Sequence, residues 1–111
     1  MSDPLDATGS PRFSLGTVLA TSGALEALEA SGQSPAFFLD RHARGDWGEV
    51  EHGDWQLNDH ALQDGSRILS AYKTLKDEKI WIITEATDDD GKRAAATLLL
   101  PSVAFFVMWP W

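Results

Sequence analysis

The sequence predicts an α+β domain in which two to three N-terminal helices pack on a three- to four-stranded antiparallel β-meander. Helix caps and apolar residues at helical spacing are confined to residues 21–65, whereas β-branched and aromatic residues dominate residues 67–100. Helices followed by a run of strands are typical of the α+β class. The length of 111 residues suits one such domain.

The first twenty residues lead into this domain. Residues 1–12 are rich in Ser, Asp, Pro and Gly and predict a flexible leader, so we expect the domain itself over residues 13–101. Residues 13–20 fit a short strand or a turn, and Gly16 weakens either structure.

Two short helices are predicted before residue 45. A helix over residues 24–30 has Ser and Thr cap residues before it, apolar residues at helical spacing within it, and Gly32 after it. Ser34 and the proline that follows it supply an N-cap and a first helical residue. We therefore expect a second helix over residues 36–44, ended by Gly45.

A third helix is predicted after a turn-rich link. Residues 45–53 contain three glycines separated by acidic residues, a pattern typical of turns. The helix itself is expected over residues 54–63 and is closed by Gly65. The residues that its spacing turns to one side are Trp55, Asn58 or Asp59, and Leu62.

Three strands are predicted next. Residues 67–74 and 79–85 are rich in β-branched and aromatic residues and are joined by a Lys-Asp-Glu turn. Asp-Gly at 90–91 suits a hairpin, and residues 94–100 form the third strand, which Pro101 ends.

Residues 102–111 are apolar, carry no charge and contain four aromatic residues. The segment is too short to span a bilayer. We expect it to form a fourth strand at the edge of the sheet. The alternative is a contact surface for a partner or for a second copy, which would make the protein a homodimer.

Composition narrows the classes of function. The chain has 17 acidic and 9 basic residues, a formal net charge of −8, and no cysteine. The lack of cysteine excludes disulfides, cysteine-ligated zinc, iron–sulfur clusters and thiol nucleophiles. The sequence shows no signal peptide and no apolar run of membrane-spanning length, so we expect a cytoplasmic protein without a membrane contact. Phosphate binding depends on Lys and Arg, so a basic protein is a more suitable partner than nucleic acid itself.

The excess negative charge is confined to one part of the chain. Residues 1–64 contain eleven acidic and three basic residues, whereas residues 65–111 contain six of each. Residues 45–64 contain no base, and this stretch fits either a solvated face or an acidic docking surface. Trp47, in Gly-Asp-Trp-Gly, fits either a core anchor or the hot spot of such a surface. The candidate interaction residues are Asp46, Trp47, Glu49, Glu51, Asp54, Trp55, Asp59 and Asp64.

Sequence motifs of known chemistry are not found. His42, His52 and His60 lack the spacing of a zinc site, so no metal is expected. The chain contains neither a serine-nucleophile elbow nor a Gly-rich phosphate loop, and no cofactor is expected. The sequence therefore favours a protein that is not an enzyme.

A series of short segments carries a resemblance that spans residues 13–101. These segments are FSLG at 13–16, ATSGALEAL at 20–28, SPAFFL at 34–39, RH at 41–42, GDWG at 45–48, ND at 58–59, GSRILSAY at 65–72 and KIWIITEA at 79–86. In them the chain resembles a family of small proteins that are carried on bacterial plasmids and integrative mobile elements and have no assigned chemistry. The chain departs from that family after Ala86, in an expanded Asp-rich turn and in the apolar residues 102–111. The resemblance implies a mobile-element setting and supplies no catalytic residues.

One enzymatic alternative stays open. Helices followed by a meander also resemble the layout of barnase-like ribonuclease toxins, which would make Glu85 the base, Arg67 the phosphate clamp and His42 the acid. Arg67 and Glu85 equally fit a cross-strand ion pair, and the acidity of the chain would repel an RNA substrate.

The function that these observations favour is inhibition by binding. We expect a non-enzymatic acidic protein that acts as a nucleic-acid mimic and docks on the basic, nucleic-acid-binding surface of a host defence complex. The mobile-element setting implies a restriction or CRISPR complex as the target, so the protein would be of the anti-restriction or anti-CRISPR type.

Overall fold

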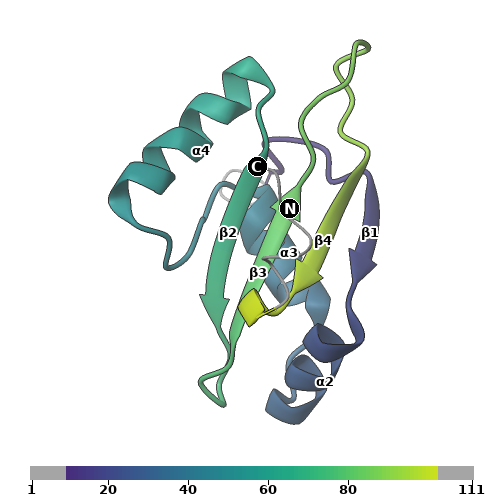
Figure 1. Ribbon diagram of the computed structural model, residues 1–111, viewed down its shortest axis with the longest axis vertical. Helices are drawn as coiled ribbons and strands as arrows, with labels where there is room; N and C mark the ends of the chain where they lie inside the picture. The colour runs from purple at the N-terminus through teal and green to yellow at the C-terminus, as the bar shows by residue number, and fades with distance from the viewer. Residues whose placement is uncertain (1–9, 103–111) are drawn as a thin grey trace, which may run out of the picture.

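A four-stranded sheet forms the centre of the computed structural model, which describes residues 10–102 (Figure 1). Two helices, α2 and α3, cover one face of the sheet, and a third, α4, stands beside one of its edges (Figure 1). The elements, in chain order, are β1 (Thr17–Ala20), α2 (Ser22–Ser31), α3 (Pro35–Ala43), α4 (His52–Asp64), β2 (Ile68–Lys73), β3 (Lys79–Thr84) and β4 (Ala95–Leu99). The predicted α+β class is confirmed.

The sheet is mixed, and this corrects the prediction of a purely antiparallel meander. Its strand order is β1-β4-β3-β2, and the pairs β2–β3 and β3–β4 are antiparallel as expected. β1 pairs with β4 in parallel, with Thr17 opposite Ala95. No turn joins these two strands, because three helices and two strands lie between them, so local sequence carries no signal for their direction. Residues 103–111, which include nearly all of the predicted edge strand, lie outside the described residues.

The first two helices begin where their cap residues predict, and α2 also ends as predicted, whereas α3 ends at Ala43, one residue early, with Arg44 and not Gly45 at the C-cap position. The Thr21 hydroxyl accepts a hydrogen bond from the Ala24 N–H at 3.2 Å, and Gly32 ends α2 at a φ of 74°. The Ser34 hydroxyl accepts from the Phe37 N–H at 3.3 Å, and proline occupies the first turn of α3. Local capping chemistry therefore accounts for the starts of both helices and for the end of α2.

The third helix is longer at its start than the sequence predicts. α4 begins at His52, two residues before Asp54, with Glu51 at the N-cap position. The Glu51 side chain makes no capping hydrogen bond, so this helix start has no recognisable cap signal. Its end at Gly65, with a φ of 80°, is as predicted.

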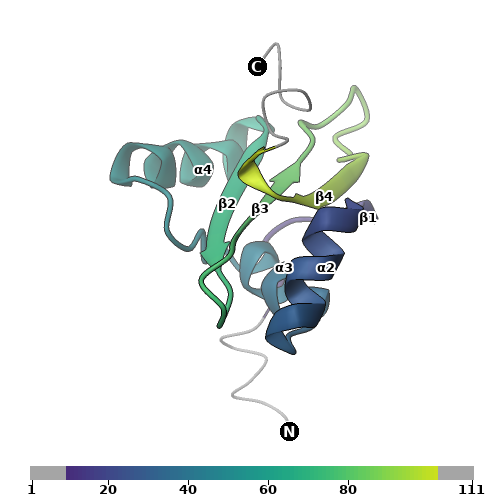
Figure 2. The ribbon, with the colours of Figure 1, turned by 60° about the horizontal axis from the view of Figure 1, so that its bottom comes forward.

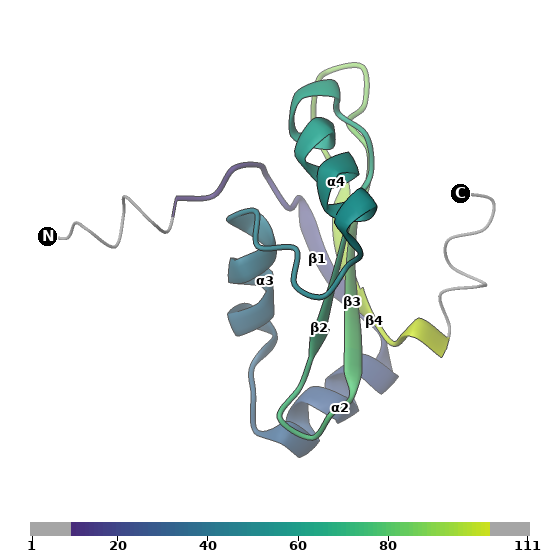
Figure 3. The same ribbon diagram turned by 90° about the vertical axis from the view of Figure 1, so that its left-hand side faces the viewer.

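The main core lies between the sheet and the helices α2 and α3, which Figure 2 shows together below the strands. Ile80 and Ile82 of β3 pack there against Leu28 of α2 and Phe38 of α3. Within the described residues, no helix has both the length and the apolar character to cross a membrane. The opposite face of the sheet carries a smaller cluster made of strand residues. In Figure 3, α3 lies on one side of the strands only.

Candidate interaction surface

The link between α3 and α4 is held against the outer edge of β2. The Ala71 N–H donates to the Trp47 carbonyl at 3.1 Å, and the Glu49 N–H donates to the Ala71 carbonyl at 2.6 Å. Gly48, between them, has a φ of 74°, and a Cβ atom there would lie 2.0 Å from the Ala71 carbonyl oxygen. Only glycine allows this approach, so the link has one defined path along the strand.

Asn58 fastens α4 to the same strand edge. Its side-chain amide donates to the Leu69 carbonyl at 2.6 Å and accepts from the Leu69 N–H at 3.2 Å. The side chain thus replaces the backbone of a neighbouring strand, and it is buried. Of the two alternatives for this helix position, Asn58 faces inward and Asp59 is exposed.

Replacing Asn58 with alanine is expected to lower the free energy of unfolding by about 1–3 kcal/mol, because the backbone N–H and carbonyl of Leu69 both lose their partner in a partly buried place. Chemical denaturation measures the change. Gln56→Ala is the matched control, since Gln56 is exposed on the same helix and should change stability by no more than about 0.5 kcal/mol. Equal effects of the two substitutions would contradict the anchoring role of Asn58.

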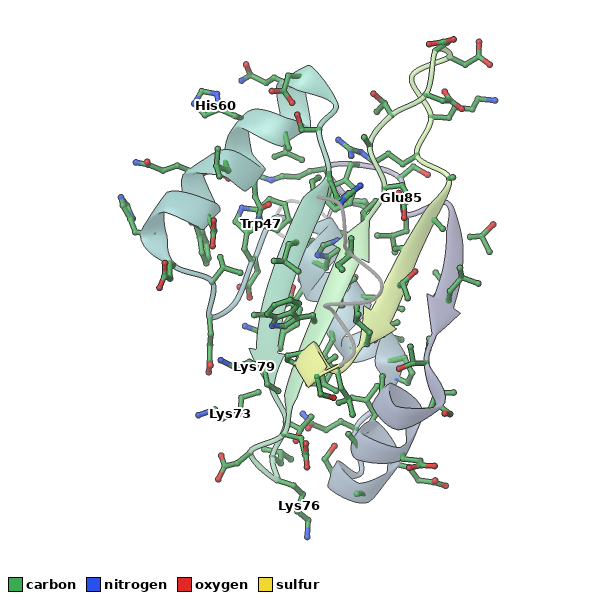
Figure 4. All side chains as sticks on the ribbon, viewed as in Figure 1. Trp47, His60, Lys73, Lys76, Lys79 and Glu85 are labelled. Atoms are coloured by element: carbon green, nitrogen blue, oxygen red, sulfur yellow. The ribbon has the colours of Figure 1, made fainter. Side chains whose placement is uncertain are left out.

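Trp47 lies in the core. Its side chain is 0% exposed and packs with Ala61 of α4 and Ile68 of β2. Its indole N–H donates to the Asp59 carboxylate at 3.0 Å. Figure 4 shows Trp47 on the sheet side of α4 and His60 on the outer side. Trp47 and Asp59 therefore join the α3–α4 link to the helix, and Trp55 packs partly buried in the same cluster.

Asp46 is neutralised by a base from α3. The Arg41 Nε donates to its carboxylate at 2.7 Å, and the Gly48 N–H donates to it at 3.1 Å. Burial alone would raise the pKa of Asp46, but these two hydrogen bonds and the charges of Arg41 and Arg44 outweigh it and lower the pKa. Tyr72 completes the arrangement, because its hydroxyl donates to the Asp46 carbonyl at 2.6 Å and its ring lies 4.6 Å from the Arg41 guanidinium.

Residues 45–64 contain no basic residue, but basic residues of α3 lie beside them in the folded chain. Arg41 and Arg44 line a hollow of about 510 Å³ together with Gly45, Asp46 and Trp55. Residues 45–64 thus divide into a part that α3 neutralises and a part that it does not.

Within residues 45–64, most of the acidic residues that α3 does not neutralise lie at the start of α4. Glu49, Glu51 and Asp54 are exposed, and we call these three residues the acidic corner. Between residues 10 and 102, the ion pairs are Arg41–Asp46 and Arg44–Asp40, and neither uses a residue of the acidic corner. Asp64 is exposed at the other end of α4, where hydrogen bonds from Ser66 lower its pKa.

His42 is held inside the core by two hydroxyl groups. Its Nδ1 lies 2.5 Å from the Ser70 Oγ and its Nε2 lies 2.7 Å from the Thr84 Oγ1. Burial, with the positive charge of Arg93, lowers the pKa of His42 to about 3, so the ring is neutral at pH 7. A fully buried ring with both nitrogens engaged is not offered to a substrate in this arrangement.

The other residues of the ribonuclease alternative lie at strand ends. The register that pairs Ile68 with Thr84 places Arg67, just before β2, opposite Glu85, just after β3. Glu85 is exposed and Arg67 is half-buried, whereas His42 is buried beneath the sheet. Solvent therefore reaches the Glu85 carboxylate but not the His42 ring.

The three histidines lie in different surroundings. His52 contacts Gln56 at 3.3 Å, His60 is exposed on the outer side of α4 (Figure 4), and His42 is in the core. In the part of the chain that the structure describes, no three His, Asp or Glu side chains are grouped as metal ligands.

Arg93 holds the sheet and α4 together, and sequence reasoning missed it. Its guanidinium donates to the carbonyls of Ala61 at 3.0 Å, Ser66 at 2.7 Å and Glu85 at 2.9 Å. Burial lowers its pKa, and the charge of Asp64 acts in the opposite direction. An arginine after an Asp-rich turn carries no sequence signal for this role.

The residues of this surface therefore have two roles. Trp47, Asn58 and Asp59 build its support, and the acidic corner is presented to solvent.

Comparisons of the chain with models of protein families, with curated proteins and with solved structures find no match.

Proposed function

We propose that this protein is a non-enzymatic binding protein whose acidic corner docks on a basic, nucleic-acid-binding surface of another protein. The observation that carries the proposal is the exposure of Glu49, Glu51 and Asp54 on a support that the sheet holds in place. Three carboxylates in the α3–α4 link and the first turn of α4 offer a partner's Lys and Arg side chains a compact anionic target.

The rigid support favours binding. The two backbone hydrogen bonds to Ala71 fix the link that carries Glu49, and Asn58 fixes the helix that follows. Less conformational entropy is lost on binding when the charged groups are already positioned. A charge cluster on a defined path is therefore better suited to specific docking than the same charges on a loose loop.

The charge of the whole chain acts in the same direction. A net charge of −8 attracts a basic surface over distance and speeds association at low salt. Carboxylates placed where a nucleic acid would put its phosphates would make the protein a nucleic-acid mimic. In the mobile-element setting that the sequence resemblance implies, a restriction or CRISPR complex of the host is the target that we propose.

Reversing the acidic corner tests the proposal. The variant Glu49→Lys/Glu51→Lys/Asp54→Lys is expected to capture nucleic-acid-binding proteins from a bacterial lysate at least about tenfold less than the unmodified chain does. The reason is that three attractive contacts become repulsive. The control Glu26→Lys/Glu29→Lys/Asp89→Lys makes the same change of net charge at exposed positions elsewhere. It should capture the same proteins as the unmodified chain.

The salt concentration of the wash distinguishes electrostatic binding from binding through apolar contacts. Capture by the unmodified chain should decrease strongly between about 0.05 and 0.5 M salt, since the Debye length decreases from over 10 Å to a few ångström. Capture that survives both high salt and reversal of the acidic corner would contradict the proposed function.

A further inference from the structure

One face of the sheet is covered by none of the helices α2, α3 and α4 and has an apolar centre. The chain enters a helical turn at Pro101 and Ser102, just after β4. The apolar cluster of this face consists of Leu69 on β2, Trp81 and Ile83 on β3, and Leu99 on β4. Ile83 and Leu99 are buried at its centre, whereas Leu69 and Trp81 are only half-buried and are the side chains that a further layer would cover. We call these four residues the helix-free face. In Figure 3 α3 lies on the opposite side of the sheet.

Charged residues mark the ends of this face. Lys73 and Lys79 pair across β2 and β3 at one end of the sheet, and Glu85 follows β3 at the other end (Figure 4). Between these ends the face is apolar apart from Thr97 of β4, which lies opposite Ile83. Such a patch on a sheet is normally covered by another layer of the protein or by a partner.

The sheet order limits where the chain can continue after β4. Both neighbours of β4 are already strands, β1 on one side and β3 on the other. The chain that leaves β4 therefore has no strand position beside it. The outer edge of β2 is also occupied, at Leu69 by Asn58 and at Ala71 by the α3–α4 link.

We propose that residues 103–111 cover the helix-free face of their own chain. Their sequence, VAFFVMWPW, is apolar throughout and carries no charge. They follow Ser102, which is three residues beyond Leu99 of the helix-free face. Nine residues reach up to about 30 Å, whereas the two strand spacings from β4 to β2 measure about 10 Å. The segment is thus long enough to cross from β4 to β2.

The observations favour this segment over a second copy. A segment joined to β4 has an effective concentration in the millimolar range, far above that of a free partner chain. Two chains that each carry a net charge of −8 also repel one another, which opposes face-to-face pairing. For residues 103–111, which belong to the same chain and carry no charge, neither the low concentration of a free partner nor this repulsion opposes binding.

Nuclear Overhauser effects in the full chain test the proposal. We expect contacts between the methyl groups of the half-buried Leu69 and the ring protons of Phe105, Phe106 or Trp109. The methyl groups of Leu28, which lie in the core on the other face, are the control and should show no such contact. Phe105→Leu and Phe106→Leu, made separately, assign the ring signals with little change in apolar volume.

A mixed sample distinguishes the two occupants. Equal amounts of a methyl-labelled chain and an unlabelled chain should give no contact between copies, and the contacts should not change on dilution. Contacts that appear between copies only, and that weaken on dilution, would make a second chain the occupant and overturn the proposal. An absence of any contact between residues 103–111 and the helix-free face would overturn it as well.

Discussion

Replacing Trp47 with alanine is expected to lower the free energy of unfolding by about 3–5 kcal/mol, the usual cost of removing a large aromatic side chain from a core. The side chain is 0% exposed, lies against the rings of Phe13 and His42, and donates its indole N–H to Asp59. Its removal would leave a cavity in the core, and the Asp59 carboxylate would lose its hydrogen-bond donor. Urea denaturation followed by circular dichroism measures the change without relying on tryptophan fluorescence.

A neighbouring apolar residue supplies the control for Trp47. Leu57 lies on α4 and is 65% exposed, so Leu57→Ala should change stability by no more than about 0.5 kcal/mol. Should Trp47→Ala fold with nearly unchanged stability, the core position of Trp47 would be contradicted, and an interface role for its side chain would be favoured instead.

Lowering the pH from 7 to 4 is expected to cost about 3 kcal/mol of folding free energy through His42 alone. The pKa of His42 is about 3 in the folded chain against 6.5 ordinarily, so between these values the unfolded chain binds a proton that the folded chain does not. Stability therefore decreases as the pH decreases through this window, by about 1.4 kcal/mol per pH unit below 6.5. Above pH 6.5 this contribution is fully present.

Two measurements check the His42 prediction. Urea denaturation of the unmodified chain at several pH values between 4.5 and 7.5 gives the slope. Nuclear magnetic resonance of the His42 ring gives its protonation directly in the unmodified chain. A ring that titrates near pH 6.5 in the folded state would contradict burial between Ser70 and Thr84.

Local chemistry explains which elements the sequence predicts well. Thr21 and Ser34 bond the first free N–H groups of their helices, and Gly32 and Gly65 adopt the left-handed conformation that ends them. Each of these signals lies within a few residues of the feature that it determines. α4 starts earlier than predicted because Glu51, its N-cap residue, provides no such signal.

Contacts between distant residues explain what the sequence does not predict. The parallel pairing of β1 with β4 joins residues 17–20 to residues 95–98, and no turn specifies it. Arg93 finds its partners at Ala61, Ser66 and Glu85 only after α4 and the strands are in place. Patterns along the chain carry no information on either arrangement.

The candidate interaction surface is likewise predictable only in part, because it too depends on contacts between distant residues. Counting charges along residues 45–64 identifies an acidic stretch, but Arg41, which neutralises Asp46, lies on the preceding helix and outside that stretch. The tryptophan that the sequence allows as a hot spot is in the core, with Asp59 as its hydrogen-bond acceptor. Eight candidate interaction residues thus reduce to an acidic corner of three, with the support that positions it.

We propose that the acidic corner competes with nucleic acid for a basic surface. Once a nucleic-acid-binding protein has been captured, the anisotropy of a fluorescent duplex bound to it measures this competition directly. The unmodified chain is expected to displace the duplex, and Glu49→Lys/Glu51→Lys/Asp54→Lys should need at least about tenfold more protein to do so. Displacement by that variant at the same concentration as the unmodified chain would contradict the claim.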